Sequence, residues 1–229
     1  MTTPAGRASL AARTRIGLFS SLTSSGSRLL VGTFAEACRD GRLPGVQVAF
    51  VFCNREVGES PVTDESAREL TALGLEVVRA SAARFRPEEL AWARARAREG
   101  DDDPLWRWRD AWYGTFRDRL SPTDLDLLLG DMWIWGRRQC SQRKAVNLHP
   151  ALPSGPLGKM WYDVVWDLIA SEAEVSGVML HRVTPQVDRG PVVTSCAYRL
   201  RGAELDPLWA ALPRCPHERA ALVATQRAL

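Results

Sequence analysis

The sequence has little of several residue types that mark particular classes of protein. Its 229 residues include only three histidines and five cysteines, and no two cysteines form a Cys-x-x-Cys pair. Without such a pair there is no zinc knuckle, and an odd number of scattered thiols is typical of a reducing compartment. We therefore expect neither a disulfide scaffold nor a metal centre.

Long hydrophobic runs and strong net charge are also missing. Residues 1–15 lack the apolar core of a signal peptide, and no later run approaches the length of a membrane span. The 30 basic and 27 acidic residues leave a formal charge of +3, too small to indicate a nucleic-acid or membrane partner. We expect a cytoplasmic protein that binds small molecules, with a flexible N-terminus over residues 1–14. The oligomeric state is left open.

The chain does contain an alternation of apolar runs and helical patterns. Val46–Phe52, "VQVAFVF", is nearly continuous in its apolar character, which is typical of a parallel strand covered on both faces. Strands are expected at 15–19, 46–52, 75–78, 125–129, 146–149, 178–183 and 192–200. Helices are expected at 29–39, 65–73, 87–99, 105–120, 161–171 and 217–227. This order predicts one α/β domain over residues 15–229, with a mostly parallel central sheet and helices on both faces.

One histidine lies in a short apolar run, "VNLHPALP", that a proline ends. Side chains alternate along a strand, so Asn147 and His149 share a face, and Pro150 places His149 at the carboxyl end of the strand. Open α/β sheets bind ligands at that end. An amide donor and a titratable imidazole suit a reaction in which a carbonyl oxygen becomes an oxyanion. The spacing alone fits a structural histidine equally well.

A carboxylate later in the chain is the natural partner for this pair. Asp188 lies in an otherwise apolar stretch beside Gly190, whose missing side chain would let the backbone approach a ligand closely. A carboxylate next to His149 would favour the imidazolium and orient the ring. Composition alone also fits a simple Asp-x-Gly turn, so both interpretations stay open.

Four stretches follow one another in the order typical of a known family. They are the Ser/Gly loop after the first strand, "FVFCNR", "NLHPALP" and "SGVMLHRVTPQVDRGPVV". Over residues 15–201 the chain resembles the folate-dependent formyltransferases, and among them the single-domain glycinamide ribonucleotide transformylases. The combination of Asn-x-His-Pro with Asp-x-Gly-Pro is the most specific part. The resemblance implies a Rossmann-like formyltransferase fold.

The resemblance also implies an activity. A formyl group would pass from the co-substrate 10-formyltetrahydrofolate to a primary amine, by default glycinamide ribonucleotide in purine synthesis, without a metal. Carried over by position, Asn147 would bind the formyl oxygen, His149 would stabilise the oxyanion, and Asp188 would keep His149 charged and move protons. The alternatives are another acceptor, such as an amino sugar or a specialised-metabolite amine, hydrolysis of the folate, and a non-catalytic folate- or RNA-binding protein.

Binding residues follow from the same resemblance. The folate would contact the backbone of Met132, Trp133, Ile134 and Trp135, with His181 lining the site. The tryptophan side chains fit a role in the core equally well. The phosphate of the acceptor, or another anionic group, would lie on Gly26, Ser27 and Arg28 at the start of a helix. Arg28 stands where the family has asparagine, and the loop before it is longer.

An extra segment between residues 86 and 125 interleaves aromatic residues with arginines. Its sequence at 105–119, "LWRWRDAWYGTFRDR", has a texture that can bind RNA by stacking and phosphate contacts. An amphipathic helix with its tryptophans packed inward has the same texture, and the acidic run 101–103 opposes an anionic partner. We therefore expect a packed helix here rather than a nucleic-acid surface.

Overall fold

The computed structural model describes residues 13–130 and 133–212. The strands are β1 (Thr14–Phe19), β2 (Val46–Cys53), β3 (Val77–Arg79), β4 (Leu125–Leu128), β5 (Ala145–His149), β6 (Val175–Arg182) and β7 (Val192–Arg199). The helices are α1 (Ser25–Arg39), α2 (Pro61–Ala72), α3 (Pro87–Arg98), α4 (Asp103–Phe116), α5 (Arg137–Gln142), α6 (Trp161–Ala170) and α7 (Asp206–Ala211). A short 3₁₀ turn, Arg117–Arg119, follows α4.

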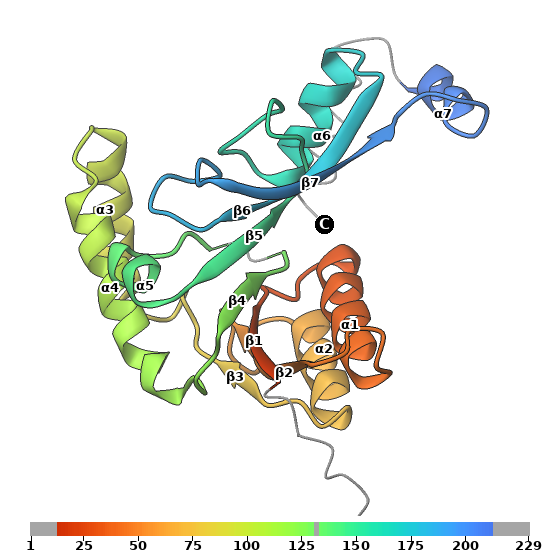
Figure 1. Cartoon of the computed structure of the whole chain (residues 1–229). Coiled ribbons are helices and arrows are strands. Elements are labelled where there is room, and N and C mark those ends of the chain that lie inside the picture. Colours follow the sequence, from red (N-terminus) through yellow and green to blue (C-terminus); the bar gives the residue numbers. More distant parts are fainter. Residues whose placement is uncertain (1–12, 131–132, 213–229) are drawn as a thin grey trace, which may run out of the picture.

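The strands form one seven-stranded sheet in the order β3-β2-β1-β4-β5-β6-β7 (Figure 1). β1 to β5 are parallel, whereas β6 and β7 are antiparallel and form the hairpin-like edge. The chain runs from β1 outwards through β2 and β3, then returns to β4 on the other side of β1. Open α/β sheets bind ligands at the carboxyl ends of the strands beside such a reversal. The predicted mostly parallel sheet is confirmed.

Helices cover both faces of this sheet, as predicted. On one face Phe19 and Phe52 pack with Trp112 of α4 in a large aromatic core. On the other face Leu18 and neighbouring aliphatic residues pack against Val31 of α1 and against α2. Figure 1 shows α1 and α2 on one side of the strands and α3 and α4 on the other. Burial on both sides accounts for the continuous apolar character of β2.

The segment rich in tryptophan and arginine forms the amphipathic helix α4. Trp108, Trp112 and Phe116 are at most 2% exposed, and the Phe116 ring stacks on Phe52 with centroids 4.2 Å apart. Arg107 lies on the exposed side and pairs with an aspartate one turn away. The inward tryptophans are therefore core residues and do not form a stacking surface.

Two helices begin before their apolar residues do. α1 begins at Ser25 instead of residue 29, because the side chain of Ser24 accepts a hydrogen bond from the Ser27 amide at 3.1 Å. α2 also begins earlier than predicted, with Ser60 as its N-cap. Capped first turns are polar, so apolar periodicity does not detect them.

Two short helices, α5 and α7, were not predicted, and β3 covers 77–79 instead of 75–78. The helix predicted at 217–227 lies outside the described residues. No helix within 13–130 and 133–212 combines the length and apolar character needed to cross a membrane.

Candidate active site

The fold brings Asn147, His149 and Asp188 together at the carboxyl end of β5, and these three residues are called the trio below. The Oδ2 atom of Asp188 lies 3.4 Å from Nδ1 of His149. The side-chain amide of Asn147 donates to the other Asp188 oxygen at 3.4 Å. Asp188 reaches the pair from the turn between β6 and β7, which lie beside β5 in the sheet.

His181 belongs to the same cluster. It is the cross-strand partner of Asn147, and its Nε2 lies 3.1 Å from the Asn147 amide nitrogen and 3.4 Å from Asp188. Its Nδ1 faces the carbonyl oxygen of Arg182 at 3.1 Å, and a carbonyl only accepts, so Nδ1 donates there. Nε2 faces both neighbours: in the neutral ring it accepts from the Asn147 amide, and in the charged ring it donates to the Asp188 carboxylate. His181 thus orients Asn147 in addition to lining the site.

The turn that carries Asp188 requires a left-handed backbone conformation at Asp188 and a close backbone approach at Gly190. Asp188 has φ +55°, a left-handed conformation that aspartate adopts more readily than most residues. A Cβ atom on Gly190 would lie 1.8 Å from the carbonyl oxygen of Arg182. The Arg182 amide donates to the Pro191 carbonyl at 2.9 Å and closes the turn. The Asp-x-Gly-Pro pattern therefore has a structural role as well as a chemical one.

The trio is partly buried and carries an ionised carboxylate: Asn147 and Asp188 are of intermediate exposure, and His149 is buried. His149 and His181 are 3% and 2% exposed, and the Asp188 side chain is 9% exposed. Burial acts to raise the pKa of Asp188, but the His181 hydrogen bond, the charge of His149 and the Gly158 amide together lower this pKa below its usual value. A buried carboxylate held in this way favours a charged imidazole beside it.

A loop over residues 150–160 covers the trio. His149 Nε2 donates to the carbonyl oxygen of Pro156 at 2.8 Å, and the Gly158 amide donates to Asp188 at 3.0 Å. Lys159 pairs with Asp167 of α6 at 2.5 Å and attaches the loop to that helix. Sequence reasoning did not find these contacts.

The predicted folate-binding residues are only partly placed. Met132 lies outside the described residues. Trp135 is 3% exposed and packs on Phe19, and Trp133 packs on two tryptophans of α4. Both side chains are therefore core aromatics. Ile134 is 40% exposed. A role for the backbone of 132–135 in pterin recognition stays a prediction.

The predicted anion loop lies at the point where the strand order reverses. Gly130, just after β4, approaches Ser27 so closely that a Cβ on the glycine would be 2.7 Å from Cβ of the serine. Arg28 instead points to α2, where its guanidinium lies 3.1 Å from Glu69. Gly26 and Ser27 lie near the carboxyl ends of β1 and β4, but Ser27 is 4% exposed and its amide and hydroxyl both bond to Ser24, while carboxylates hold Arg28. In the described part of the chain no group of three or more potential ligand residues could hold a metal ion.

Comparisons with known proteins identify the fold. No model of a protein family matches the chain. No curated protein sequence matches it either. Solved structures do match. Glycinamide ribonucleotide transformylase 1 from Geobacillus kaustophilus has a TM-score of 0.59 and 21% identity over 86% of this chain and 88% of that one.

Two further structures agree. Glycinamide ribonucleotide transformylase 1 from Symbiobacterium toebii has a TM-score of 0.55 and 23% identity, over 84% of this chain and 76% of its own. Formyltetrahydrofolate deformylase from Burkholderia mallei has a TM-score of 0.58 and 17% identity, over 88% of this chain and 59% of its own. At these identities the similarity confirms the Rossmann-like formyltransferase fold.

Proposed function

We propose that this protein transfers a formyl group from 10-formyltetrahydrofolate to a primary amine, within a single domain over residues 15–229. The observation that carries the proposal is the convergence of Asn147 and Asp188 on the buried His149 at the carboxyl end of β5. Structures with this fold are named for glycinamide ribonucleotide, which is therefore the default acceptor and would place the reaction in purine synthesis.

The contact between His149 and Pro156 indicates where the formyl oxygen would bind. His149 Nε2 already donates to a carbonyl oxygen at 2.8 Å, the distance expected for an oxyanion donor. In the productive complex the formyl oxygen replaces the Pro156 oxygen, and this hydrogen bond strengthens as negative charge develops. The loop over 150–160 must then move, and Gly158, with φ +69°, offers a position where the backbone can change direction.

Proton movement completes the reaction. The attacking amine loses one proton as its bond to the formyl carbon forms, and the folate nitrogen gains one as its bond to that carbon breaks. Asp188, ionised and in contact with His149 and Asn147, is the group that relays this proton. The charged imidazole of His149 remains the partner of the oxyanion.

The structure constrains the identity of the amine acceptor less than it constrains the formyl-transfer reaction. A helix N-terminus suits an anionic group, but at the start of α1 the amides of Ser27 and Arg28 already bond to Ser24, and the Arg28 side chain is occupied by Glu69. An amino sugar or a specialised-metabolite amine is therefore a second candidate acceptor. The fold similarity to a formyltetrahydrofolate deformylase favours hydrolysis as the second candidate reaction, with water in place of the amine.

The test incubates the purified protein with 10-formyltetrahydrofolate and single amines, including glycinamide ribonucleotide and amino sugars. Tetrahydrofolate is followed by absorbance, and the formylated product by mass spectrometry. We expect folate turnover that requires one class of amine. Turnover without any amine would identify a hydrolase. Folate binding by a folded protein without turnover under any condition would overturn the enzyme proposal and leave a folate-binding protein.

A variant links the turnover to the trio. His149→Ala should lower it by about a hundredfold or more, because a lost oxyanion donor costs at least that much. Ser195→Ala, on the exposed strand β7, is the matched control and should keep full activity. An active His149→Ala protein would show that the oxyanion contact is made elsewhere.

A further inference from the structure

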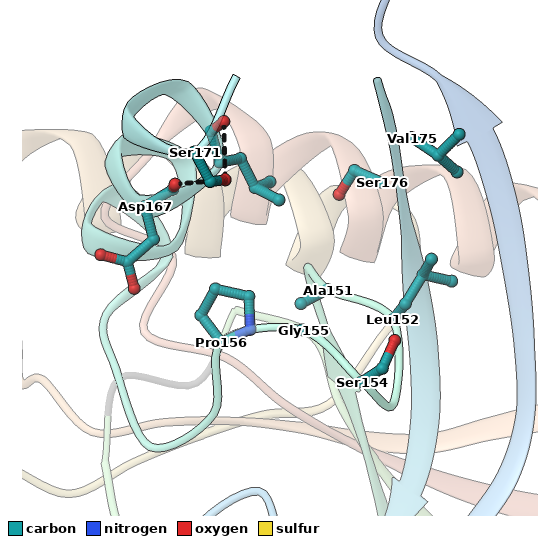
Figure 2. A pocket seen from close by; sticks show the side chains of 10 residues that line it. Ala151, Leu152, Ser154, Gly155, Pro156, Asp167, Ser171, Val175 and Ser176 are labelled. Atoms are coloured by element: carbon teal, nitrogen blue, oxygen red, sulfur yellow. Dashed lines mark hydrogen bonds between the residues drawn. The ribbon is translucent and has the colours of Figure 1, made fainter. Parts of the chain in front are cut away.

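A cavity of about 430 Å³ lies beside the loop that covers the trio. The loop, α6 and β6 form its walls, and neither His149 nor Asp188 lines it (Figure 2). The cavity is therefore distinct from the candidate active site. Its size is that of a small-molecule site.

Most of the lining is apolar. Leu152, Pro156 and Leu168 contribute to the walls from the loop and from α6. Leu152 lies directly over Gly177 of β6, where a Cβ atom would be only 2.5 Å from a methyl group of the leucine. The missing side chain of Gly177 thus lets the loop pack on the sheet and gives the cavity a formed wall.

One buried polar group in this lining has no hydrogen-bond partner within the described structure. Ser176 of β6 is 2% exposed, and its hydroxyl makes no hydrogen bond within the described structure. Figure 2 shows this hydroxyl directed towards the space between β6 and α6. Ser171, also in the lining, instead donates to the carbonyl oxygen of Asp167 at 2.8 Å. Buried hydroxyls are normally paired, so the Ser176 hydroxyl is a candidate contact for a ligand.

The charges around the cavity restrict the ligand. Among the described residues that line it, Asp167 alone is ionisable, and its carboxylate is paired with Lys159. No cationic side chain lines the cavity to receive a phosphate or a carboxylate. Neither the glutamate end of a folate nor a phosphorylated acceptor fits such a lining. The apolar walls and the buried, unpaired hydroxyl of Ser176 instead suit an uncharged molecule.

We propose that this cavity is a second ligand site, in which Ser176 anchors an uncharged small molecule that has an apolar body and one hydrogen-bonding group. Pro156 connects the two sites, because it lines the cavity and its carbonyl oxygen contacts His149. A bound ligand therefore restrains the loop and changes the surroundings of the His149 ring. The effect of this coupling on turnover rests on the proposed function, whereas binding itself does not.

The test is an NMR titration of the isotope-labelled full chain with benzyl alcohol. We expect saturable shifts at the amides of Gly155 and Ser176. Toluene, which lacks the hydroxyl, should bind about tenfold more weakly, as expected for one lost hydrogen bond. Benzoate should produce no saturable shift at these amides. Absence of saturation with benzyl alcohol, or equal affinity for toluene, would overturn the proposed site.

A pair of variants tests the anchor. Ser176→Val removes the hydroxyl and keeps a residue suited to a strand, so benzyl alcohol should bind about tenfold more weakly. Ser195→Val, on the exposed strand β7, should leave the affinity unchanged. Unaltered affinity in Ser176→Val would refute the anchor. If Ser176→Val does not fold, the comparison of benzyl alcohol with toluene on the wild-type protein still tests the hydroxyl anchor.

The ring resonances of His149 report the coupling in the same titration. They should move with the same affinity as the Gly155 amide. Binding at the cavity without movement of the ring would overturn the coupling. The two proposals fail in different ways. If the formyl-transfer proposal is wrong, folate turnover is absent while the NMR shifts at the cavity persist.

Discussion

Asp188 is the residue on which the contacts of the candidate site converge. It accepts hydrogen bonds from Asn147 and Gly158 and lies 3.4 Å from a nitrogen of each neighbouring histidine. Burial acts to raise the pKa of Asp188, but the contacts lower it by more than burial raises it. The pKa in the folded state is therefore below that in the unfolded chain. Its ionised form therefore contributes stability above the unfolded pKa of about 3.9, and this contribution is lost as the pH falls through the folded pKa.

Asp188→Asn tests this dependence. The variant should melt at a lower temperature than the wild type at neutral pH. The difference should shrink as the pH falls below about 4 towards the lowered pKa of the folded carboxylate, because the unfolded chain binds its proton first. Thermal melting by circular dichroism across this range provides the measurement. Asp118→Asn, at an 84% exposed side chain, is the control and should change the melting temperature little. A wild-type advantage that grows in acid would contradict the lowered pKa.

The cysteines should differ in reactivity. Desolvation by burial, with a further contribution from Asp110, raises the pKa of Cys140 to about 11, whereas Cys196 is exposed on β7. Thiols react as thiolates, so at about pH 8 Cys196 should be alkylated by iodoacetamide well before Cys140. Peptide mass spectrometry over time distinguishes the two. Labelling of Cys140 as fast as that of Cys196 in the folded protein would show that Cys140 is more accessible than described.

The placement of Asn147 and His149 could be predicted from the sequence because it follows from local rules, whereas the role of Asp188 beside them came from the family resemblance. Side-chain alternation and Pro150 place Asn147 and His149 on one face at the end of a strand. The contact of Pro156 with His149 depends on the path of a loop, and the pairing of Arg28 with Glu69 depends on how α2 packs beside α1. Neither leaves a pattern in the sequence.

Gly190 permits the turn between β6 and β7 that carries Asp188. Gly190→Ala would force a methyl group against the carbonyl of Arg182, where a Cβ would be 1.8 Å away. We expect a loss of about 1–3 kcal/mol in the free energy of unfolding, as for an overpacked site, measured by urea denaturation. Folate turnover should also fall, because the displaced turn carries Asp188.

Gly32→Ala supplies a control with the opposite sign. Gly32 is in α1, and a Cβ there meets nothing within 4 Å. Alanine is favoured over glycine in a helix by up to about 1 kcal/mol, so this variant should be more stable than the wild type. If both glycine substitutions changed stability equally, backbone entropy rather than the close approach at Arg182 would explain the effect of Gly190→Ala.

Helices with their own apolar pattern could be predicted, whereas α5 could not. Its sequence, Arg137–Gln142, is mostly polar and short. Tertiary contacts hold it in place: Asp110 of α4 accepts a hydrogen bond from the Arg138 amide at 2.8 Å, and Gly136 allows the close approach of α4. Such a helix depends on its neighbour, so its own sequence carries little signal.

Across the whole molecule, stability should decrease from the centre of the sheet to one edge. β1 pairs with strands on both sides, and Leu18 and Phe19 are fully buried between the two layers of helices. Among the strands of residues 13–130 and 133–212, β7 pairs only with β6, and all eight of its residues are exposed. The candidate site lies between these extremes, on β5 and the turn after β6. A rigid parallel sheet thus supports Asn147 and His149, while a less stable edge supplies Asp188.

Hydrogen exchange measured by mass spectrometry tests this gradient. Peptides from β1 and β2 should exchange slowly, through openings that approach global unfolding, whereas peptides from β7 should exchange through local openings of lower free energy. Addition of folate should slow exchange in the turn that carries Asp188 more than in β1. A ligand bound at the trio stabilises this turn, which belongs to the less stable edge of the sheet. Protection of β7 equal to that of β1 in the free protein would contradict the described edge and show that another chain covers it.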